Sequence, residues 1–331
     1  MKNIWTNWAF VSNLTIHGIT TRHFMLNLSL PVAFLIIFGQ IAIAETRISG
    51  GLMRNTCTEL CELSYWQSAT LETLHATLDA GVNLNGHDER GDTPLHWVAA
   101  SKDPNLAQTL IDAGAVVNVV NESGFTPLSI ALDSGNLALM KVLLENDANL
   151  YLRGDRFGTL LHSAVSWEHT DIVMYLLEMG LSPYEVNVDG NTPIQKTAHR
   201  HDPEIMALLL ADRSPGLAML ENAIQLSSLD QANRNGETAL HWAVFFGNSG
   251  FEVAKMLLDI GANPNIQDED GQTPLHKAVR VGGPEIISLL IRFGADASIL
   301  DRDGYSVFDL AQQNERLIGT SVYQQLKDAV P

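Results

Sequence analysis

Along the chain, pairs of short segments with apolar residues at helical spacing are separated by polar turns. In one such stripe Leu137, Met140, Leu143 and Leu144 recur at steps of three and four residues, which predicts an amphipathic helix. The second stripe of a pair is followed by a glycine that favours a left-handed helix end; examples are Gly114, Gly180, Gly261 and Gly294. This pattern predicts an all-α chain of stacked helix pairs.

One motif fixes the phase of these pairs. Thr93-Pro94-Leu95-His96 recurs, intact or degraded, in copies that begin at Thr126, Thr159, Thr192, Thr238, Thr273 and Ser306. The starts are 33 residues apart up to Thr192, and then 46, 35 and 33 residues apart. Six copies have a glycine two positions before the Thr or Ser: Gly91, Gly124, Gly190, Gly236, Gly271 and Gly304. Such a period is typical of a solenoid, in which each unit buries its apolar face against its neighbours.

The motif, the period and the Leu-Leu-x-x-Gly-Ala text of the second halves resemble the ankyrin repeat, in the style of secreted or periplasmic bacterial proteins. The resemblance implies an α-solenoid with short β-hairpin-like turns over residues 57–331. It gives an N-terminal capping repeat at 57–87 and a C-terminal cap at 301–331. Between them lie repeats at 88–120, 121–153, 154–186, 187–232, 233–267 and 268–300.

Three repeats depart from the pattern. Phe157 stands where the third repeat should have its turn glycine and Leu160 replaces the proline, so we expect a distorted turn there. The fourth repeat is 13 residues longer than the 33-residue period, and residues 216–224 read as an additional helix. This 211–232 insertion is either a finger for a partner or a tolerated surface insertion, because longer loops cost little free energy. Ser249 and Gly250 lengthen the fifth repeat.

The N-terminal 44 residues read as a signal peptide. Arg22 precedes a nearly continuous apolar run that ends in Ala42-Ile43-Ala44, which predicts cleavage after Ala44 and a periplasmic or secreted protein. Residues 45–56 read as a linker. The alternative is an uncleaved anchor that would make the chain a structural envelope protein, since about 20 apolar residues span a bilayer.

The acidic excess of the chain limits the classes of molecule that it can bind. Residues 45–331 carry 18 basic and 38 acidic side chains, which argues against nucleic acid and anionic membranes. We expect a monomer without cofactors that binds another protein, one with a basic surface. The two cysteines, Cys57 and Cys61, would form a local disulfide in an oxidising compartment, or stay as buried thiols.

The residues with chemical potential give no catalytic site. His96, His162, His241 and His276 share one repeat position, so they cannot converge on one ion, and we expect them to bond backbone groups of adjoining turns. His199, His201 and Asp202 form one compact cluster, but residues two apart on a helix diverge. A metal, ligand or enzymatic role of this cluster with the 211–232 insertion is the alternative to protein binding. No nucleotide-binding or hydrolase motif occurs.

The resemblance instead implies a concave protein-binding face, lined by turn tips and by the exposed ends of the first helices. The positions that we expect to contact a partner are Arg90, Asp92, Phe125, Asp133, Trp167, His199, Arg200, Phe245, Phe246 and Arg280. Aromatic residues carry much of the free energy of protein interfaces, which favours Trp167 and the two phenylalanines. For Phe245 and Phe246, packing against the inserted Ser249-Gly250 is the alternative.

Overall fold

A computed structural model describes residues 59–101, 103–151, 158–211, 229–281 and 283–329. The predicted signal peptide, the linker, Cys57, Phe157 and residues 212–228 of the insertion lie outside the described residues. The described residues all belong to one compact unit.

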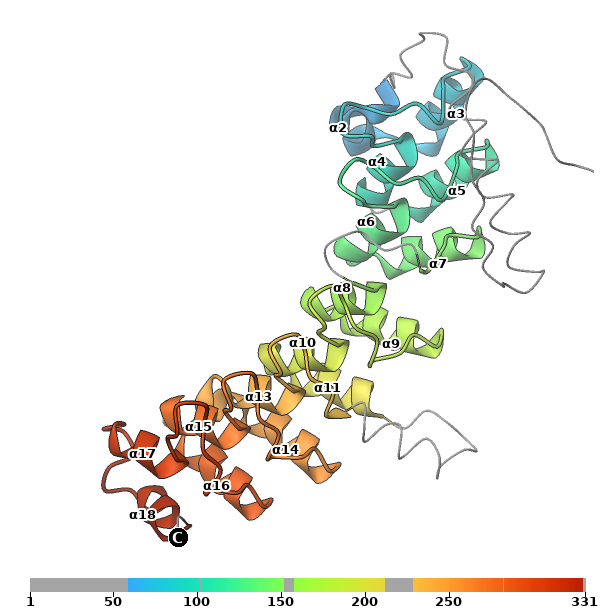
Figure 1. The fold of residues 1–331 in the computed structure, drawn as a ribbon. Coiled ribbons are helices and arrows are strands. Elements are labelled where there is room, and N and C mark those ends of the chain that lie inside the picture. The colour runs from blue at the N-terminus through green and yellow to red at the C-terminus, as the bar shows by residue number, and fades with distance from the viewer. Residues whose placement is uncertain (1–58, 102, 152–157, 212–228, 282, 330–331) are drawn as a thin grey trace, which may run out of the picture. The chain divides into compact units, whose positions relative to one another are not determined.

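The described residues form two layers of helices, which Figure 1 shows as successive pairs. The first helices of the pairs are α2 (Leu63–Ser68), α4 (Pro94–Ser101), α6 (Pro127–Asp133), α8 (Leu160–Ser166), α10 (Pro193–Arg200), α13 (Ala239–Val244), α15 (Pro274–Val281) and α17 (Val307–Gln312). The second helices are α3 (Leu71–Asp79), α5 (Pro104–Asp112), α7 (Leu137–Glu145), α9 (Thr170–Glu178), α11 (Pro203–Leu210), α14 (Phe251–Asp259), α16 (Pro284–Arg292) and α18 (Ser321–Ala329). Short 3₁₀ turns lie at η1 (Glu59–Cys61) and η2 (Gly247–Gly250).

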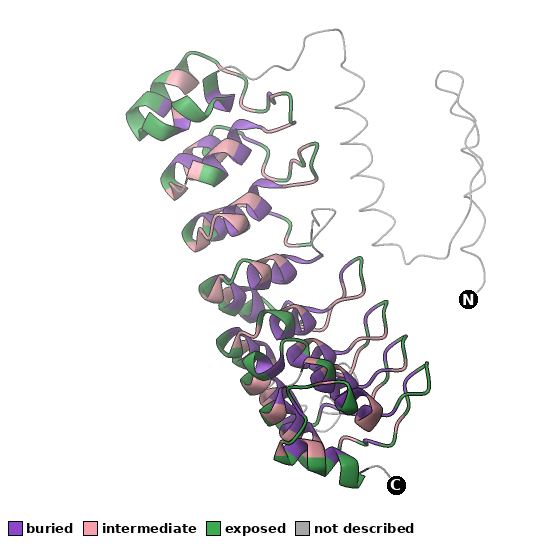
Figure 2. Cartoon of the chain, turned by 90° about the vertical axis from the view of Figure 1, so that its left-hand side faces the viewer, coloured by how far each residue is buried: buried purple, intermediate pink, exposed green. Residues whose placement is uncertain are grey.

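Each first helix packs against the first helix of the next pair, from α2 through to α17. Apolar side chains from both layers form one continuous core, and Figure 2 shows buried residues on the facing sides of the helices and exposed residues at helix ends and turn tips. No strand occurs in the described part of the chain; the closest feature is an isolated bridge between Leu300 and Ser306. The predicted all-α solenoid of ankyrin type is therefore confirmed.

The first helices begin as the motif predicts. Thr126 is the N-cap of α6, where its hydroxyl accepts a hydrogen bond from the backbone N–H of Ser129, and Pro127 occupies the first turn, which needs no N–H donor. Five of the second helices are followed by a glycine with positive φ, as predicted; Gly114 has a φ of 101° and Gly261 a φ of 97°. After α7 the non-glycine Asp147 takes this conformation, with a φ of 63°.

The turns between helix pairs are stabilised by a side chain that accepts backbone hydrogen bonds and by a glycine with positive φ. Asp268 Oδ1 accepts from the backbone N–H groups of Asp270 and Gln272, at 3.0 and 2.8 Å, and Gly271 takes a φ of 73°. Successive tips also bond to each other: the backbone N–H of Arg302 donates to the carbonyl oxygen of Asp270 at 2.9 Å. These bonds hold neighbouring repeats in register and position the residues that flank each motif.

Candidate functional site

The motif histidines belong to the scaffold. The backbone N–H of Thr238 donates to His241 Nδ1 at 3.1 Å, and His241 Nε2 lies 3.0 Å from the carbonyl oxygen of Gln272 in the next repeat. An amide N–H can only donate, so Nδ1 must accept and the neutral ring carries its proton on Nε2. His96 and His162 make the equivalent pairs of contacts, to Phe125 and Asn191. The predicted bonding to adjoining turns is thus present for these three rings. His276 Nδ1 accepts from the backbone N–H of Thr273 at 3.2 Å, but its Nε2 has no hydrogen-bond partner among the described residues.

Burial lowers the pKa of His96, His241 and His276. Accepting carbonyl groups and nearby carboxylates oppose this shift but do not cancel it. The rings therefore stay neutral at physiological pH, as a hydrogen-bonded scaffold requires.

The His199–Asp202 cluster departs from expectation in its geometry. Helix α10 ends at Arg200, and His201 takes the left-handed conformation with a φ of 58°. The ring centroids of His199 and His201 therefore lie 5.6 and 4.9 Å from that of Phe246. The prediction that the two rings diverge, as on a continuing helix, is wrong, because the helix ends between them.

Asp202 does not join the two rings as a third ligand; its Oδ1 caps α11 by accepting from the backbone N–H of Ile205 at 3.0 Å. Within the described residues no three His, Cys, Asp or Glu side chains are close enough to hold a metal ion. Burial, followed by the charges of Lys196 and Arg200, lowers the pKa of His199, and burial with His199 lowers the pKa of His201. Both rings instead make edge-to-face contacts with Phe246.

Phe245 and Phe246 lie directly after α13, where the inserted residues form η2. Their side chains are 48% and 46% exposed, and their ring centroids are 5.1 Å apart. A Cβ on Gly250 would lie 1.7 Å from the carbonyl oxygen of Ala243, so only glycine allows η2 to pack this closely on α13. The phenylalanine pair thus stays half exposed, while Phe246 packs on the histidines of the preceding repeat.

Trp167 follows α8 and is 56% exposed. Its side chain lies near enough to the carboxyl of Asp133, at the end of α6, to affect the pKa of that group. Burial raises the pKa of Asp133, and the contacts with Trp167 and His169 oppose that rise. The ring of His169 lies against Gly135 and its Nε2 is 3.4 Å from the carbonyl oxygen of Asp133. Trp167 is therefore an exposed ring beside the carboxyl of Asp133.

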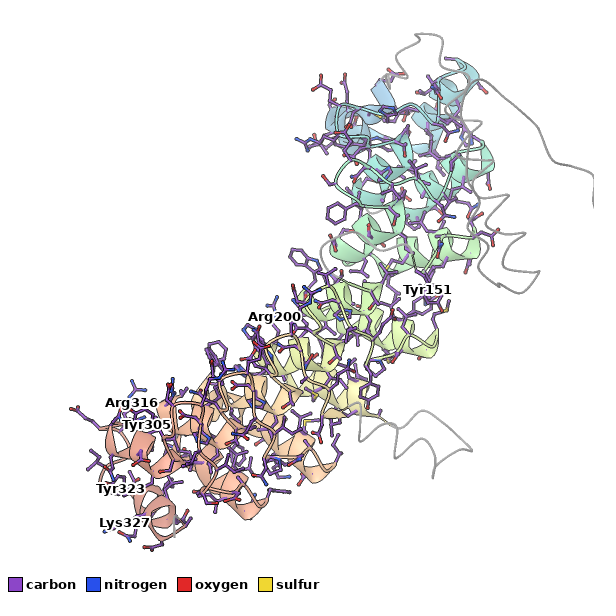
Figure 3. All side chains as sticks on the ribbon, viewed as in Figure 1. Tyr151, Arg200, Tyr305, Arg316, Tyr323 and Lys327 are labelled. Atoms are coloured by element: carbon purple, nitrogen blue, oxygen red, sulfur yellow. The ribbon has the colours of Figure 1, made fainter. Side chains whose placement is uncertain are left out.

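Arg200 links the tryptophan to the aromatic cluster. Its Nη1 donates to Glu168 Oε1 at 3.1 Å, and its Nη2 donates to the carbonyl oxygen of Ser166. Both partners are chain neighbours of Trp167, and Arg200 itself follows His199. Figure 3 shows Arg200 and Tyr151 on opposite sides of the ribbon. We define the aromatic surface as Asp133, Trp167, His199, Arg200, Phe245 and Phe246.

The other predicted contact residues lie elsewhere. Asp92 serves the scaffold, because its Oδ1 accepts from Asn121 Nδ2 at 2.6 Å, and Phe125 is half-buried with its carbonyl beside His96. Arg90 is exposed at the first tip. Arg280 lines a cavity of about 600 Å³ at the end of α15, together with Arg316.

Sequence reasoning missed Trp242, His169 and Arg316. The Trp242 ring centroid lies 4.7 Å from that of His199, and Trp242 precedes Phe245 by less than one helical turn. The position after each motif could have indicated it, because Trp97 and Lys277 also follow motif histidines. His169 and Arg316 contact residues of other repeats, and such contacts cannot be predicted from a single sequence.

The comparisons with known proteins agree with this architecture. A family model described as ankyrin repeats (3 copies) matches residues 65–154 and 161–268, and another, ankyrin repeats (many copies), matches 257–311. The chain belongs to the ankyrin-repeat family. Ankyrin repeats generally mediate protein binding and are generally non-catalytic, which supports a protein-interaction scaffold.

Similar curated proteins share only parts of their length with this ankyrin-repeat chain. It is 26% identical over 222 residues to the putative palmitoyltransferase ZDHHC13 of Danio rerio, covering 67% of this chain and 32% of that protein. It is 33% identical over 157 residues to protein PhlB of Serratia liquefaciens, covering 44% and 63%. It is 26% identical over 200 residues to human inversin, covering 60% and 14%. The chain thus spans less than two thirds of each of these relatives.

None of the helices in the described ranges has the length and the apolar character needed to span a bilayer.

Proposed function

We propose that this protein is an exported, monomeric ankyrin scaffold that binds another protein through the aromatic surface and performs no chemistry of its own. The observation that carries the proposal is the row of exposed rings at the ends of α8 and α13, namely Trp167, Phe245 and Phe246. Exposed large aromatic side chains favour binding, because each buries a large apolar area while few rotatable bonds are ordered on association.

Charge supports a partner with a basic surface. The chain after residue 44 has 38 acidic and 18 basic side chains, and a net negative field speeds association with a positively charged protein. Asp133 and Glu168 lie beside the exposed Trp167, so a lysine or arginine of the partner would meet both a ring face and carboxylates there.

Export rests on the N-terminal sequence: Arg22, the apolar run and Ala42-Ile43-Ala44 are typical of a cleaved signal peptide. Recovery of a soluble chain that begins at Glu45 from the periplasm or the medium supports this part of the proposal. Recovery of the intact N-terminus in the membrane fraction would instead make the protein an anchored envelope component.

The binding surface is tested by cross-linking in the native compartment followed by quantitative mass spectrometry, comparing the wild type with Trp167→Ala/Arg200→Ala. Loss of a tryptophan from the centre of an interface costs about 2 kcal/mol or more, so we expect capture of the partner to fall about thirtyfold. The fold should persist, because both side chains are exposed and the ion pair of Arg200 with Glu168 contributes about 1 kcal/mol at most.

The matched control is Tyr151→Ala/Arg292→Ala, which removes one exposed aromatic ring and one exposed arginine from the second-helix side. Capture should be unchanged in this control. Equal capture by the wild type and by Trp167→Ala/Arg200→Ala would refute the aromatic surface as the binding site, and equal loss in both double variants would show a general effect.

A further inference from the structure

A cavity of about 600 Å³ lies between the end of α15 and the turn that follows α17, in the last two helix pairs of Figure 1. Arg280 and Arg316 line it, and Val281 and Leu310 add apolar surface. Glu315 is the one carboxylate among the lining residues, so the cavity carries one net positive charge. Figure 3 labels Arg316 at this end of the chain.

The backbone around the two arginines is held by the amide of Asn314. Its Nδ2 donates to the carbonyl oxygens of Val279 and Arg280, at 2.7 and 3.2 Å, and its Oδ1 accepts from the backbone N–H of Arg316 at 3.0 Å. This one side chain ties the end of α15 to the turn that carries the second arginine. The positions of both Cα atoms are therefore fixed before any ligand arrives, which lowers the entropic cost of binding.

Both guanidinium groups have donors to spare. Arg280 is 52% exposed, and its one ion pair among the described residues is to Asp301 Oδ2 at 4.0 Å, beyond hydrogen-bond length. Arg316 Nη1 makes a long bond of 3.4 Å to the carbonyl oxygen of Val281, and no described carboxylate lies within 4.0 Å of its guanidinium. A guanidinium group has five N–H donors, so most of them remain for a ligand.

The C-terminal repeats differ from the rest of the chain in their balance of acidic and basic side chains. Residues 45–273 carry 12 basic and 31 acidic side chains, whereas residues 274–331 carry six basic and seven acidic ones. An anionic group is repelled by most of the molecule, but towards the C-terminal repeats it meets a nearly balanced surface where two arginines line one cavity.

We propose that Arg280 and Arg316 bind a carboxylate of an acidic peptide segment in a protein partner, at a site separate from the aromatic surface. The planar fork of an arginine matches a carboxylate in two parallel hydrogen bonds, and Val281 and Leu310 accommodate the methylene groups beside it. The carboxylate comes either from an Asp or Glu side chain or from a free C-terminus, and the two sources share this chemistry.

The test is isothermal titration of the full mature chain at low ionic strength with three peptides built from glycine and serine. The first has a central Asp-Glu pair and blocked ends, the second replaces that pair by Asn-Gln, and the third has no acidic side chain but a free C-terminal carboxylate. We expect the first or the third peptide to bind and the second to show no heat. Whichever of them binds identifies the source of the carboxylate.

Arg280→Gln/Arg316→Gln should weaken that binding about tenfold or more, because hydrogen bonds between two charged groups are the stronger ones and glutamine cannot form them. Arg292→Gln/Arg302→Gln removes the same charge from exposed arginines outside the cavity and should leave the affinity within about twofold, which corresponds to less than 1 kcal/mol. Circular dichroism shows whether each variant is folded.

Three results would overturn the site: no peptide binds the wild type, the amide peptide binds as well as the acidic one, or the control double variant loses as much affinity as Arg280→Gln/Arg316→Gln. Because the titration uses defined peptides, it is independent of whether the aromatic surface captures a partner. Failure here and failure of the proposed function are thus distinguishable.

Discussion

Gln195 and His241 occupy equivalent positions in consecutive repeats and make equivalent bonds. Gln195 Oε1 accepts from the backbone N–H of Thr192 at 2.7 Å, as His241 Nδ1 accepts from that of Thr238 at 3.1 Å. Gln195 Nε2 donates to the carbonyl oxygen of Glu237 at 2.9 Å, and His241 Nε2 lies 3.0 Å from that of Gln272. An amide thus replaces the imidazole without loss of a bond, but it does not titrate near neutral pH.

His241→Gln should therefore remove part of the acid sensitivity of the fold while keeping its stability at pH 8. The pKa of His241 is lowered by burial, so its contribution to stability is complete above its unfolded value of about 6.5 and is lost as the pH falls through the folded value. Each such histidine adds up to about 1.4 kcal/mol per pH unit to the loss of unfolding free energy.

Urea unfolding of the wild type and of His241→Gln between pH 8 and pH 5 measures this difference. The two stability curves should lie within about 1 kcal/mol at pH 8 and separate below pH 6.5. His96 and His276 have lowered pKa values for the same reason, so the variant should keep part of the acid sensitivity. Parallel curves over the whole range would contradict the prediction.

The period of the motif was sufficient to predict most of the fold, because each repeat brings its own helix-start and turn chemistry. Thr126 caps helix α6, Pro127 is the first residue of that helix, and Gly271 has the positive φ that its turn requires. These are local consequences of residue type, which a single sequence displays.

The candidate sites could be predicted only in part. The position after each motif indicated Trp167, Arg200 and Phe246, but their mutual contacts depend on how neighbouring repeats stack. The left-handed conformation of His201 depends on where α10 ends, and its contact with Phe246 depends on η2. Arg280 and Arg316 line one cavity because Asn314 bonds across 34 and 35 residues to the end of α15, which no local pattern reveals.

A second prediction compares two turn glycines. A Cβ on Gly271 would lie 2.6 Å from the backbone nitrogen of Arg302 in the next turn, whereas a Cβ on Gly304 meets no atom within 4 Å. Both glycines have positive φ, 73° and 83°, so alanine costs about 1–2 kcal/mol of backbone strain at either position. Gly271→Ala should cost more, because it also opens the bond between neighbouring tips.

Chemical unfolding of Gly271→Ala and Gly304→Ala in parallel isolates this extra cost. We expect Gly304→Ala to lose the strain energy alone and Gly271→Ala to lose about 1 kcal/mol beyond it, the typical contribution of one hydrogen bond. If the two variants lose equal free energy, the close approach of the tips does not contribute to the stacking of repeats.

The third prediction concerns the half-buried ion pair of Lys277 with Asp268. Lys277 Nζ lies 2.7 Å from Asp268 Oδ2 and 3.6 Å from Glu237 Oε1, so it joins two turns of neighbouring repeats. Burial alone would raise the pKa of Asp268, but hydrogen bonds from Lys277 and Gln272 outweigh it and lower that pKa. The pair therefore stabilises the fold above pH 3.8, and this contribution is lost as the pH falls through the folded pKa of Asp268.

Asp268→Asn should cost about 1–3 kcal/mol at neutral pH, since it removes the charge and leaves the turn bonds in place. Asn121, Asn187 and Asn233 hold the equivalent turn position, so the amide fits it. The control is Asp88→Asn in the first full repeat, where the carboxylate accepts from Trp97 instead of pairing with a lysine. A loss in Asp268→Asn no larger than in Asp88→Asn would show that the ion pair contributes nothing.

The last prediction concerns the N-terminal capping repeat, which has a neighbour on one side only. Cys61 is buried in η1, and its sulfur lies 3.3 Å from the carbonyl oxygen of Asp92 in the next repeat. Cys57 lies outside the described residues, so the Cys57–Cys61 pairing stays a prediction from a chain with two cysteines. Alkylation of the unfolded mature protein should leave its mass unchanged without reductant and add two alkyl groups after reduction.

Cys57→Ser should then lower the stability of the capping repeat by about 2 kcal/mol, the entropy model's value for closing so short a loop. Hydrogen exchange of α2 and α3 measures this loss locally, while exchange in α15 and α16 serves as an internal control because repeats interact only with their neighbours. Alkylation of the unreduced wild type at both cysteines would exclude the bridge. Faster exchange in α2 and in α15 alike would show that Cys57 acts on the whole solenoid rather than on its cap.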